Sequence, residues 1–354
     1  MKNKLPITDC RLPVEKPAAR RFASIRNGQP ATGNSAAFSL IELMVVITIF
    51  SLIVLILMAV FNSTQTAFRA GVTQSGVLED SRAVMDLMTS DLKLMTPSDD
   101  SSNGPNSSLL YAINNSNSVA NFFAGTNLFY QPLPQDLPGS GGTRTNILQS
   151  FFMLSKQNLS GRSMWIGTGY AVMTNGSATL YPLYRFTMNA PASTDPVALF
   201  NIFANTLNGA YVINGVYANG FTNSSWSHLI DGVVDLRVHA YNPDGYLITN
   251  SVQYHYEGTQ WETNYDFNAY YQPSLNGGEP NFYFFSNAIP GAVEIQMGVL
   301  EDRVQQRAAS RGLPGQIPSP ANPAQWQYLQ SQAGRVHIFR QRVTIPNVDP
   351  TAYQ

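Results

Sequence analysis

The hydrophobic pattern begins with one long apolar run near the start of the chain. From residue 38 to residue 61 the sequence reads FSLIELMVVITIFSLIVLILMAVF, and Glu42 is its single ionisable residue. A helix of this length rises about 36 Å at 1.5 Å per residue, which is enough to cross a hydrocarbon core about 30 Å thick. We therefore predict a transmembrane helix over residues 38–61.

A helical pattern continues beyond the apolar run. Large apolar residues recur at steps of three and four positions, with polar residues between them: Met85, Met88, Leu92 and Met95. The pair Thr96-Pro97 ends this pattern. We predict an amphipathic stem helix over residues 62–97, whose methionine face covers the sheet of the body.

Alternation of apolar and polar residues predicts that the body, residues 98–354, consists mostly of β-strands. The clearest alternation covers residues 234–241, 293–299 and 336–345. Further strands are expected around residues 148–154, 164–173, 179–187 and 211–217, and loops at residues 98–107 and in the Pro-rich stretch 311–325. The pattern predicts an α+β fold, with a long N-terminal transmembrane and stem helix packed on a β-rich body.

The distribution of charge predicts how the chain is oriented. Residues 1–37 carry seven basic and two acidic side chains, a net charge of +5, whereas the rest of the chain carries a net charge of −6. A basic flank of this kind stays in the cytoplasm, so the C-terminal body should lie across the membrane. The overall net charge of −1 gives no support to a nucleic-acid binder.

The sequence lacks the patterns on which common enzymes depend. It contains no phosphate-binding loop, nucleophile elbow or HExxH pair, and its single cysteine, Cys10, excludes an internal disulfide. Isolated residues remain that could act as bases or oxygen ligands: His228, His239, His255, His337, Asp99, Asp100, Asp244 and Asp302. Without a calcium-loop pattern, and with the histidines expected on strand surfaces, we predict no catalytic residue, no metal site and no cofactor.

Two other kinds of N-terminal segment could account for part of this pattern. A secretory signal peptide has an apolar region of about 7–15 residues, which is shorter than the run observed here. A plain signal anchor explains the length and the orientation, but a carboxylate in a spanning helix costs about 2.5–3.5 kcal/mol. We therefore expect Glu42 to have a partner and a function, unless it lies near the membrane–water interface and its side chain reaches cytosolic water.

The start of the apolar run resembles a known processing motif. Phe-Ser-Leu-Ile-Glu-Leu-Met-Val-Val at residues 38–46 is similar to the prepilin motif of type IV pilins and type II secretion pseudopilins. The resemblance implies cleavage between Ala37 and Phe38 by a prepilin peptidase, N-methylation of Phe38 and loss of the leader 1–37. Ala37 stands where that family usually has glycine. Glu42 would pair with the amine of a neighbouring subunit and set the register of assembly.

Patches of the body narrow the resemblance. Residues 226–238, 289–297 and 339–343, together with 82–93 in the stem, are similar to the minor pseudopilin J and minor pilin W families, and more narrowly to protein C of the Verru_Chthon cassette. This implies a structural minor subunit in the inner membrane, with its pilin-like body in the periplasm or outside the cell. It would assemble into, or cap, a type II secretion pseudopilus or a type IV pilus-like filament. Its partners would be other minor pseudopilins or pilins, and no nucleic acid.

A different class of protein remains an alternative. A membrane-anchored extracytoplasmic enzyme, or a carbohydrate- or protein-binding protein, could share only the export signal with prepilins. An aromatic-rich stretch is relevant to this alternative: Tyr254, Tyr256, Trp261, Tyr265, Tyr270 and Tyr271. Cross-strand packing is the expected role of these residues, and a contact surface for a glycan or a protein is the alternative role.

Overall fold

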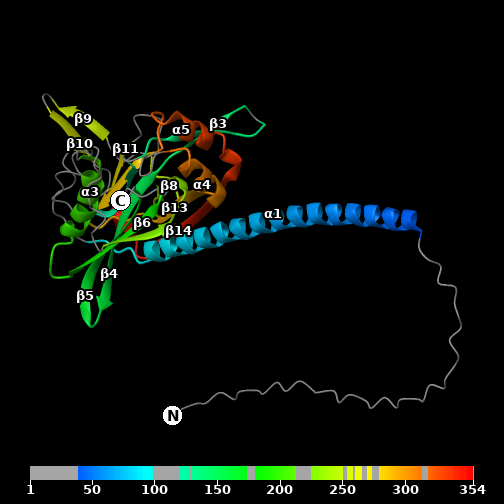
Figure 1. The fold of residues 1–354 in the computed structure, drawn as a ribbon. Helices are drawn as coiled ribbons and strands as arrows, with labels where there is room; N and C mark the ends of the chain where they lie inside the picture. The colour runs from blue at the N-terminus through cyan, green and yellow to red at the C-terminus, as the bar shows by residue number, and fades with distance from the viewer. Residues whose placement is uncertain are drawn as a thin grey trace, which may run out of the picture. The chain divides into compact units, whose positions relative to one another are not determined.

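The computed structural model describes residues 39–98, 120–127, 130–139, 141–173, 180–212, 225–249, 253–257, 260–264, 269–272, 279–312 and 318–353. The chain divides into two compact units, residues 1–63 and residues 64–354. A long helix, α1 (Leu40–Lys93), begins in the first unit and ends in the second, which also holds the β-rich body (Figure 1). The predicted α+β fold is confirmed.

A seven-stranded sheet forms the larger layer of the body. Its order is β11 (Ala269–Gln272), β12 (Asn281–Phe285), β1 (Ala120–Thr126), β4 (Gln149–Leu159), β5 (Arg162–Val172), β6 (Leu183–Pro191) and β7 (Trp226–Ile230). Every neighbouring pair is antiparallel. Ser160 and Gly161 join β4 to β5 with φ values of 51° and 78°, the left-handed backbone that a two-residue hairpin turn requires.

A three-stranded antiparallel sheet forms the second layer, in the order β14 (Val336–Thr344), β13 (Ala292–Leu300) and β8 (Val233–Tyr241). These are the three strands whose alternation was clearest in the sequence, and the prediction of strands there is confirmed. Val238 and its partner Ile295 are fully buried, as the alternation predicts. Asp235, which the alternation places on the polar face, is nevertheless fully buried, because the β2–β3 region covers it.

Shorter elements complete the body. Two hairpins pair β2 (Leu133–Asp136) with β3 (Thr143–Asn146), and β9 (Gln253–Glu257) with β10 (Gln260–Asn264). The helices are α3 (Val197–Val212), α4 (Asp302–Ala309) and α5 (Pro323–Gln330), with the 3₁₀ turns η2 (Ala333–Arg335) and η3 (Pro350–Tyr353). Figure 1 shows α4 and α5 together on the side of the body opposite to α3.

The end of α1 and helix α3 pack on opposite faces of the seven-stranded sheet. On β5, the hydroxyl of Tyr170 contacts Asp91 of α1, whereas the adjacent Gly169 faces Phe203 of α3. Successive residues of a strand point to opposite faces, so these two neighbours separate the two helices. The predicted methionine face of α1 is confirmed as core: Met85, Met88, Leu92 and Met95 are 0–3% exposed.

Three expectations from the sequence need correction. Residues 211 and 212, predicted to begin a strand, are the last residues of α3, and residues 213–217 lie outside the described residues. The short β-branched run resembles a strand, but the aromatic residues before it recur at helical spacing. In the predicted loop 311–325, residues 323–325 begin α5. Gln325 is buried there, and its amide donates to Ala308 O at 3.0 Å.

The strand predicted around residues 179–187 is β6, which begins later and extends further (Leu183–Pro191). The loop predicted at 98–107 lies outside the described residues except for Ser98.

Replacing Gly169 by alanine is expected to destabilise the body by about 1–3 kcal/mol, because overpacking forces neighbouring groups to shift. A Cβ at this position would overlap the ring of Phe203 and approach Phe151 O to 3.2 Å. Gly71→Ala is the matched control, since nothing lies within 4 Å of a Cβ there, and alanine favours an exposed helix. Urea denaturation of both variants measures the difference. Equal midpoints would contradict the proposed packing of α3 on β5.

Candidate assembly site

Glu42 lies in the first turn of α1 and forms a reciprocal pair with Ser39. The Ser39 N–H donates to Glu42 Oε2 at 3.0 Å, and the Glu42 N–H donates to Ser39 Oγ at 3.3 Å. This arrangement is a capping box, in which two side chains satisfy main-chain donors that the first turn of a helix leaves without partners. The Glu42 side chain is therefore directed back toward the start of the helix.

The capping role of Ser39 was not predicted, although the spacing Ser-x-x-Glu is the sequence signal of a capping box. Glu42 consequently has a partner within its own chain as well as the one expected on a neighbouring subunit. Ala37 and Phe38, the residues on either side of the expected cleavage, lie outside the described residues. The structure thus describes the helix directly after the predicted cut, but not the cut itself.

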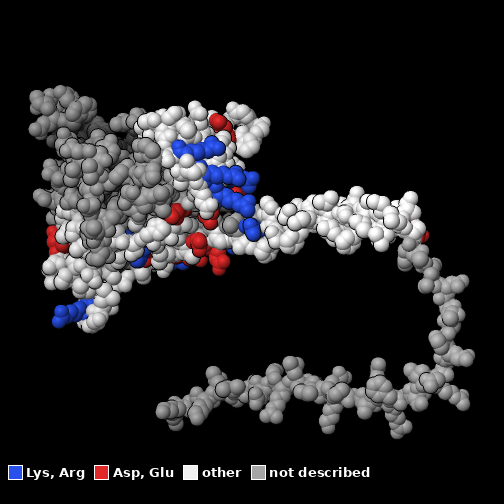
Figure 2. Space-filling model, in the orientation of Figure 1, with Lys and Arg blue, Asp and Glu red and all other residues white. Residues whose placement is uncertain are grey.

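The N-terminal part of α1 presents apolar side chains in every direction. All residues from Leu40 to Phe61 are exposed, and this part of the helix is almost entirely white, the colour of uncharged residues, in Figure 2. Helix α1 is long and apolar enough to cross a membrane. Such a surface is rare on soluble monomers and marks a site that lipid or other helices cover.

An ion-pair cluster, the Asp91 clamp, attaches the end of α1 to the seven-stranded sheet. Asp91 Oδ2 accepts hydrogen bonds from Tyr170 Oη at 2.5 Å and from Arg185 Nε at 2.8 Å. Arg185 Nη2 donates to Asp91 Oδ1 at 3.1 Å, so the guanidinium binds the carboxylate through two parallel bonds. The clamp joins α1 to β5 and β6 through residues far apart in the sequence.

Burial makes the Asp91 clamp more than a surface ion pair. The Asp91 side chain is 11% exposed and that of Arg185 is 25% exposed. Burial raises the pKa of the Tyr170 hydroxyl, and the charge of Asp91 raises it further. The hydroxyl therefore keeps its proton and remains a donor to Asp91 throughout the physiological pH range. Removing Asp91 takes the shared acceptor away from both Tyr170 and Arg185 in a partly dehydrated site.

Main-chain contacts hold the residues that follow α1. Met95 forms an isolated antiparallel bridge with Ser155 of β4, and Thr96 N donates to Leu154 O at 3.0 Å. Asn347, just after β14, donates from its side-chain amide to Met95 O at 2.8 Å. The end of the helix is therefore fixed to both sheets of the body.

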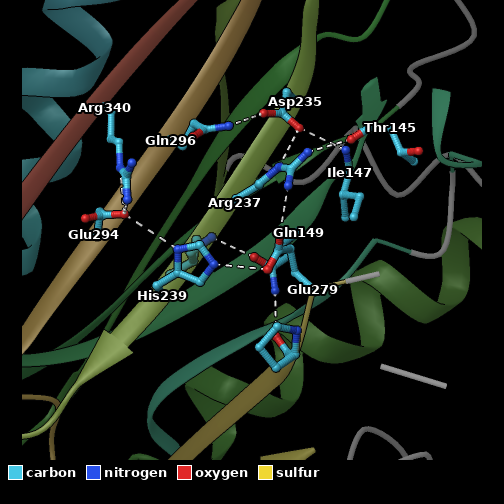
Figure 3. A network of polar contacts seen from close by, with 12 residues as sticks. Thr145, Ile147, Gln149, Asp235, Arg237, His239, Glu279, Glu294, Gln296 and Arg340 are labelled. Carbon is cyan, nitrogen blue, oxygen red and sulfur yellow. Dashed lines mark hydrogen bonds and ion pairs between the residues drawn. The ribbon is translucent and has the colours of Figure 1, made fainter. Parts of the chain in front are cut away.

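A network of charged groups lies on the polar face of the three-stranded sheet (Figure 3). Asp235 accepts hydrogen bonds from Ile147 N and Arg237 Nε, both at 2.9 Å, and from Gln296 Nε2 at 2.7 Å. Arg237 also donates to Glu279 Oε1 at 2.7 Å. Buried charges persist in proteins when they are paired in this way, so the network connects β8, β13 and the segments that cover them.

The histidines and aspartates that could act as bases or metal ligands lie apart from one another among the described residues. His228 pairs with Asp231 at 2.9 Å, His239 pairs with Glu279 at 3.0 Å, and His337 lies 3.5 Å from Glu301. Asp244 lies in the turn after β8 and Asp302 begins α4, whereas Asp99 and Asp100 lie outside the described residues. Within the described ranges, no group of three His, Cys, Asp or Glu side chains could hold a metal ion.

The aromatic-rich stretch falls on two different pairs of strands. Trp261 on β10 lies opposite Tyr256 on β9, a register that the expected cross-strand packing requires. Tyr270 and Tyr271 belong to β11, where they pair with Tyr283 and Phe282 of β12. His255 lies opposite Glu262, and Tyr265 lies outside the described residues. The described residues of the stretch therefore contribute to two different sheets.

Comparison with known proteins identifies the N-terminal segment. Residues 33–58 match a family described as "Prokaryotic N-terminal methylation motif". No curated protein matches the chain, and no solved structure matches it. The matched residues include Ala37, Phe38 and Glu42, and they end within the exposed apolar part of α1. This match and the long apolar helix α1, the one candidate membrane span among the described residues, fit a membrane-anchored protein that carries a prepilin-type N-terminal motif, the mark of pilin-like and pseudopilin-like proteins.

Proposed function

We propose that this chain is a structural minor subunit that assembles into, or caps, a type II secretion pseudopilus or a type IV pilus-like filament. The observation that carries the proposal is the methylation motif at residues 33–58, which leads directly into an exposed apolar helix. The Asp91 clamp supports it, because a subunit built into a filament by its helix needs a firm joint between helix and body.

In this proposal a prepilin peptidase cleaves the chain between Ala37 and Phe38. Residues 1–37 are the cytoplasmic leader, residues 38–61 span the inner membrane, residues 62–97 form the stem, and residues 98–354 form the body in the periplasm or outside the cell. The excess of basic residues before the helix supports this orientation. The likeness of residues 226–238 and 289–297 to minor pseudopilin J and minor pilin W supports a minor rather than a major subunit.

Glu42 provides the assembly contact in this proposal. Cleavage would create an amine on Phe38, and the capping box directs the Glu42 carboxylate toward the start of the helix. Opposite charges attract strongly in an apolar medium, where an unpaired charge is costly. Pairing of Glu42 with the amine of a neighbouring subunit would therefore fix how far one helix is displaced along the next.

Mass spectrometry of the protein isolated from membranes tests the processing step. We expect a mature chain that begins at N-methylated Phe38 and has lost Cys10 with the leader. Ala37→Gly should be cleaved at least as well, whereas Ala37→Leu should block cleavage, because a small residue is expected before the cut. An intact Met1 end in the wild type, or an end near residue 64, would contradict the proposal.

A further inference from the structure

His239 lies between two carboxylates that come from different parts of the fold (Figure 3). Its Nε2 is 3.0 Å from Glu279 Oε2, and its Nδ1 is 3.7 Å from Glu294 Oε1. Glu279 precedes β12 of the seven-stranded sheet, whereas Glu294 belongs to β13 of the three-stranded sheet. Among the described residues, the imidazole thus has one carboxylate acceptor on each side.

The arrangement favours the protonated form of the imidazole. A neutral histidine carries one N–H, so it could donate to one carboxylate while the lone pair of its other nitrogen faced the second. The imidazolium donates toward both. The hydrogen bond to Glu279 raises the pKa of His239, the charges of Glu279 and Glu294 raise it further, and burial opposes the rise. The same hydrogen bond lowers the pKa of Glu279.

The other charged groups around His239 are arginines paired with the same carboxylates. Arg237, two residues away on β8, donates to Glu279 Oε1 at 2.7 Å, and Arg340 on β14 donates to Glu294 Oε1 at 2.8 Å. The hydroxyl of Tyr241 lies 3.4 Å from Glu294 Oε2, and the Arg342 guanidinium lies 3.8 Å from the centroid of the Tyr241 ring. Arginine stays charged at all physiological pH values, so His239 is the group here that titrates near neutrality.

The contact with Glu279 lies where two layers of the body meet. Next to Glu279, Pro280 O accepts a hydrogen bond at 2.8 Å from Gln149 Nε2 of β4, and Gln149 Oε1 accepts one at 2.6 Å from Val238 N of β8. Glu279 therefore fastens the chain to β8 just before it enters β12. Loss of the His239 contact would leave Arg237 as the charged partner of Glu279 at this junction.

We propose that protonated His239 is a pH-sensitive clamp that fastens the entrance of β12 to the three-stranded sheet and releases it as the pH rises. The stabilisation is complete below the unfolded-state histidine pKa of about 6.5, and it is lost as the pH rises through the higher pKa of the folded protein. For each unit by which folding raises the pKa of His239, protonation lowers the equilibrium constant for opening about tenfold.

Hydrogen exchange of the full-length protein in detergent micelles tests the clamp through the amides of residues 281–285. Wild type and His239→Gln are compared at about pH 5.5 and again at about pH 8.5, on either side of the ordinary histidine pKa of about 6.5. Comparison at equal pH removes the intrinsic pH dependence of exchange. We expect faster exchange in His239→Gln at the lower pH and a smaller difference at the higher pH, as the wild type loses its proton.

His228→Gln is the matched control, because His228 also pairs with a carboxylate but is 46% exposed and lies in the middle of β7, away from β12 in the sheet order. It should exchange like the wild type in residues 281–285 at both pH values. If His239→Gln does not fold, Glu279→Gln keeps the histidine and removes its closer carboxylate. It should again exchange faster than the wild type at the lower pH, and the difference should narrow at the higher pH to the part that comes from the lost Arg237 ion pair. Equal exchange of wild type and variant at the lower pH, or an undiminished difference at the higher pH, would overturn the proposal.

Discussion

Replacing Glu42 by leucine is expected to reduce assembly with neighbouring subunits about a hundred-fold or more, while leaving insertion and cleavage intact. The change removes a charge from an apolar helix, so insertion should be as good or better. The leader and the residues on both sides of the cut are unchanged. Assembly suffers because the amine of the neighbouring subunit loses its carboxylate, and removing one partner of a buried ion pair costs about 3–5 kcal/mol.

The capping box gives Glu42 a second role, which a control variant separates from the first. A capping residue contributes about 0.5–2 kcal/mol to a helix, less than the loss of a buried charge partner. Glutamine can occupy the same position of a capping box but carries no charge. Glu42→Gln should therefore keep the first turn of α1 and still fail to assemble. Recovery of assembly in Glu42→Gln would assign the effect to capping.

Crosslinking to companion prepilins in membranes measures assembly for the wild type, Glu42→Leu and Glu42→Gln. Mass spectrometry on the same samples shows whether each variant is still cleaved before Phe38. If Glu42→Leu crosslinks as well as the wild type, Glu42 does not set the register between subunits. If neither variant is cleaved, the carboxylate takes part in recognition by the peptidase instead.

Replacing Asp91 by alanine is expected to lower the free energy of unfolding of the body by about 3–5 kcal/mol. The change leaves the buried hydroxyl of Tyr170 and the partly buried guanidinium of Arg185 without their shared acceptor. Urea denaturation followed by tryptophan fluorescence measures the loss, because Trp165 is buried on the same strand as Tyr170.

Asp86→Ala is the matched control for the Asp91 clamp. Asp86 is an exposed carboxylate on the same helix, and its replacement should change stability by less than about 0.5 kcal/mol. A second comparison combines Asp91→Leu, Arg185→Leu and Tyr170→Phe in one chain. Replacing all the polar groups with apolar ones should recover part of the loss, because no group remains unpaired. Equal stability of Asp91→Ala and Asp86→Ala would show that the clamp contributes nothing.

Local patterns predicted those parts of the fold that depend on neighbours in the sequence. The apolar run from residue 38 and the methionine steps up to Met95 predicted a helix and its buried face. Strands β8, β13 and β14 followed from alternation at every second residue. The capping box was also readable from Ser39 and Glu42. Each of these features depends on a periodic pattern, or on a contact, between residues only a few positions apart in the chain.

Contacts between distant residues account for most of what the sequence could not show. Asp91 and Arg185 are 94 positions apart, and no period in the sequence connects them. Asp235 lies at a polar position of an alternating strand. Its burial is understood only from its hydrogen bonds with Ile147 and Gln296, which the sequence pattern does not show. Helix α3 was missed because its last residues are β-branched and aromatic, a composition typical of strands. Earlier in the helix, Leu199 and Phe203 pack against Gly167 and Gly169 of β5.

Strand β14 lies at the edge of the three-stranded sheet, and its side chains limit how molecules can aggregate. An edge strand offers unused main-chain donors and acceptors on which another chain can add in the manner of amyloid. Arg340, Gln341 and Arg342 are exposed along this edge. Two molecules meeting there would bring arginines together, and like charges repel across paired strands. We therefore expect this edge to resist pairing with the same edge of a second molecule.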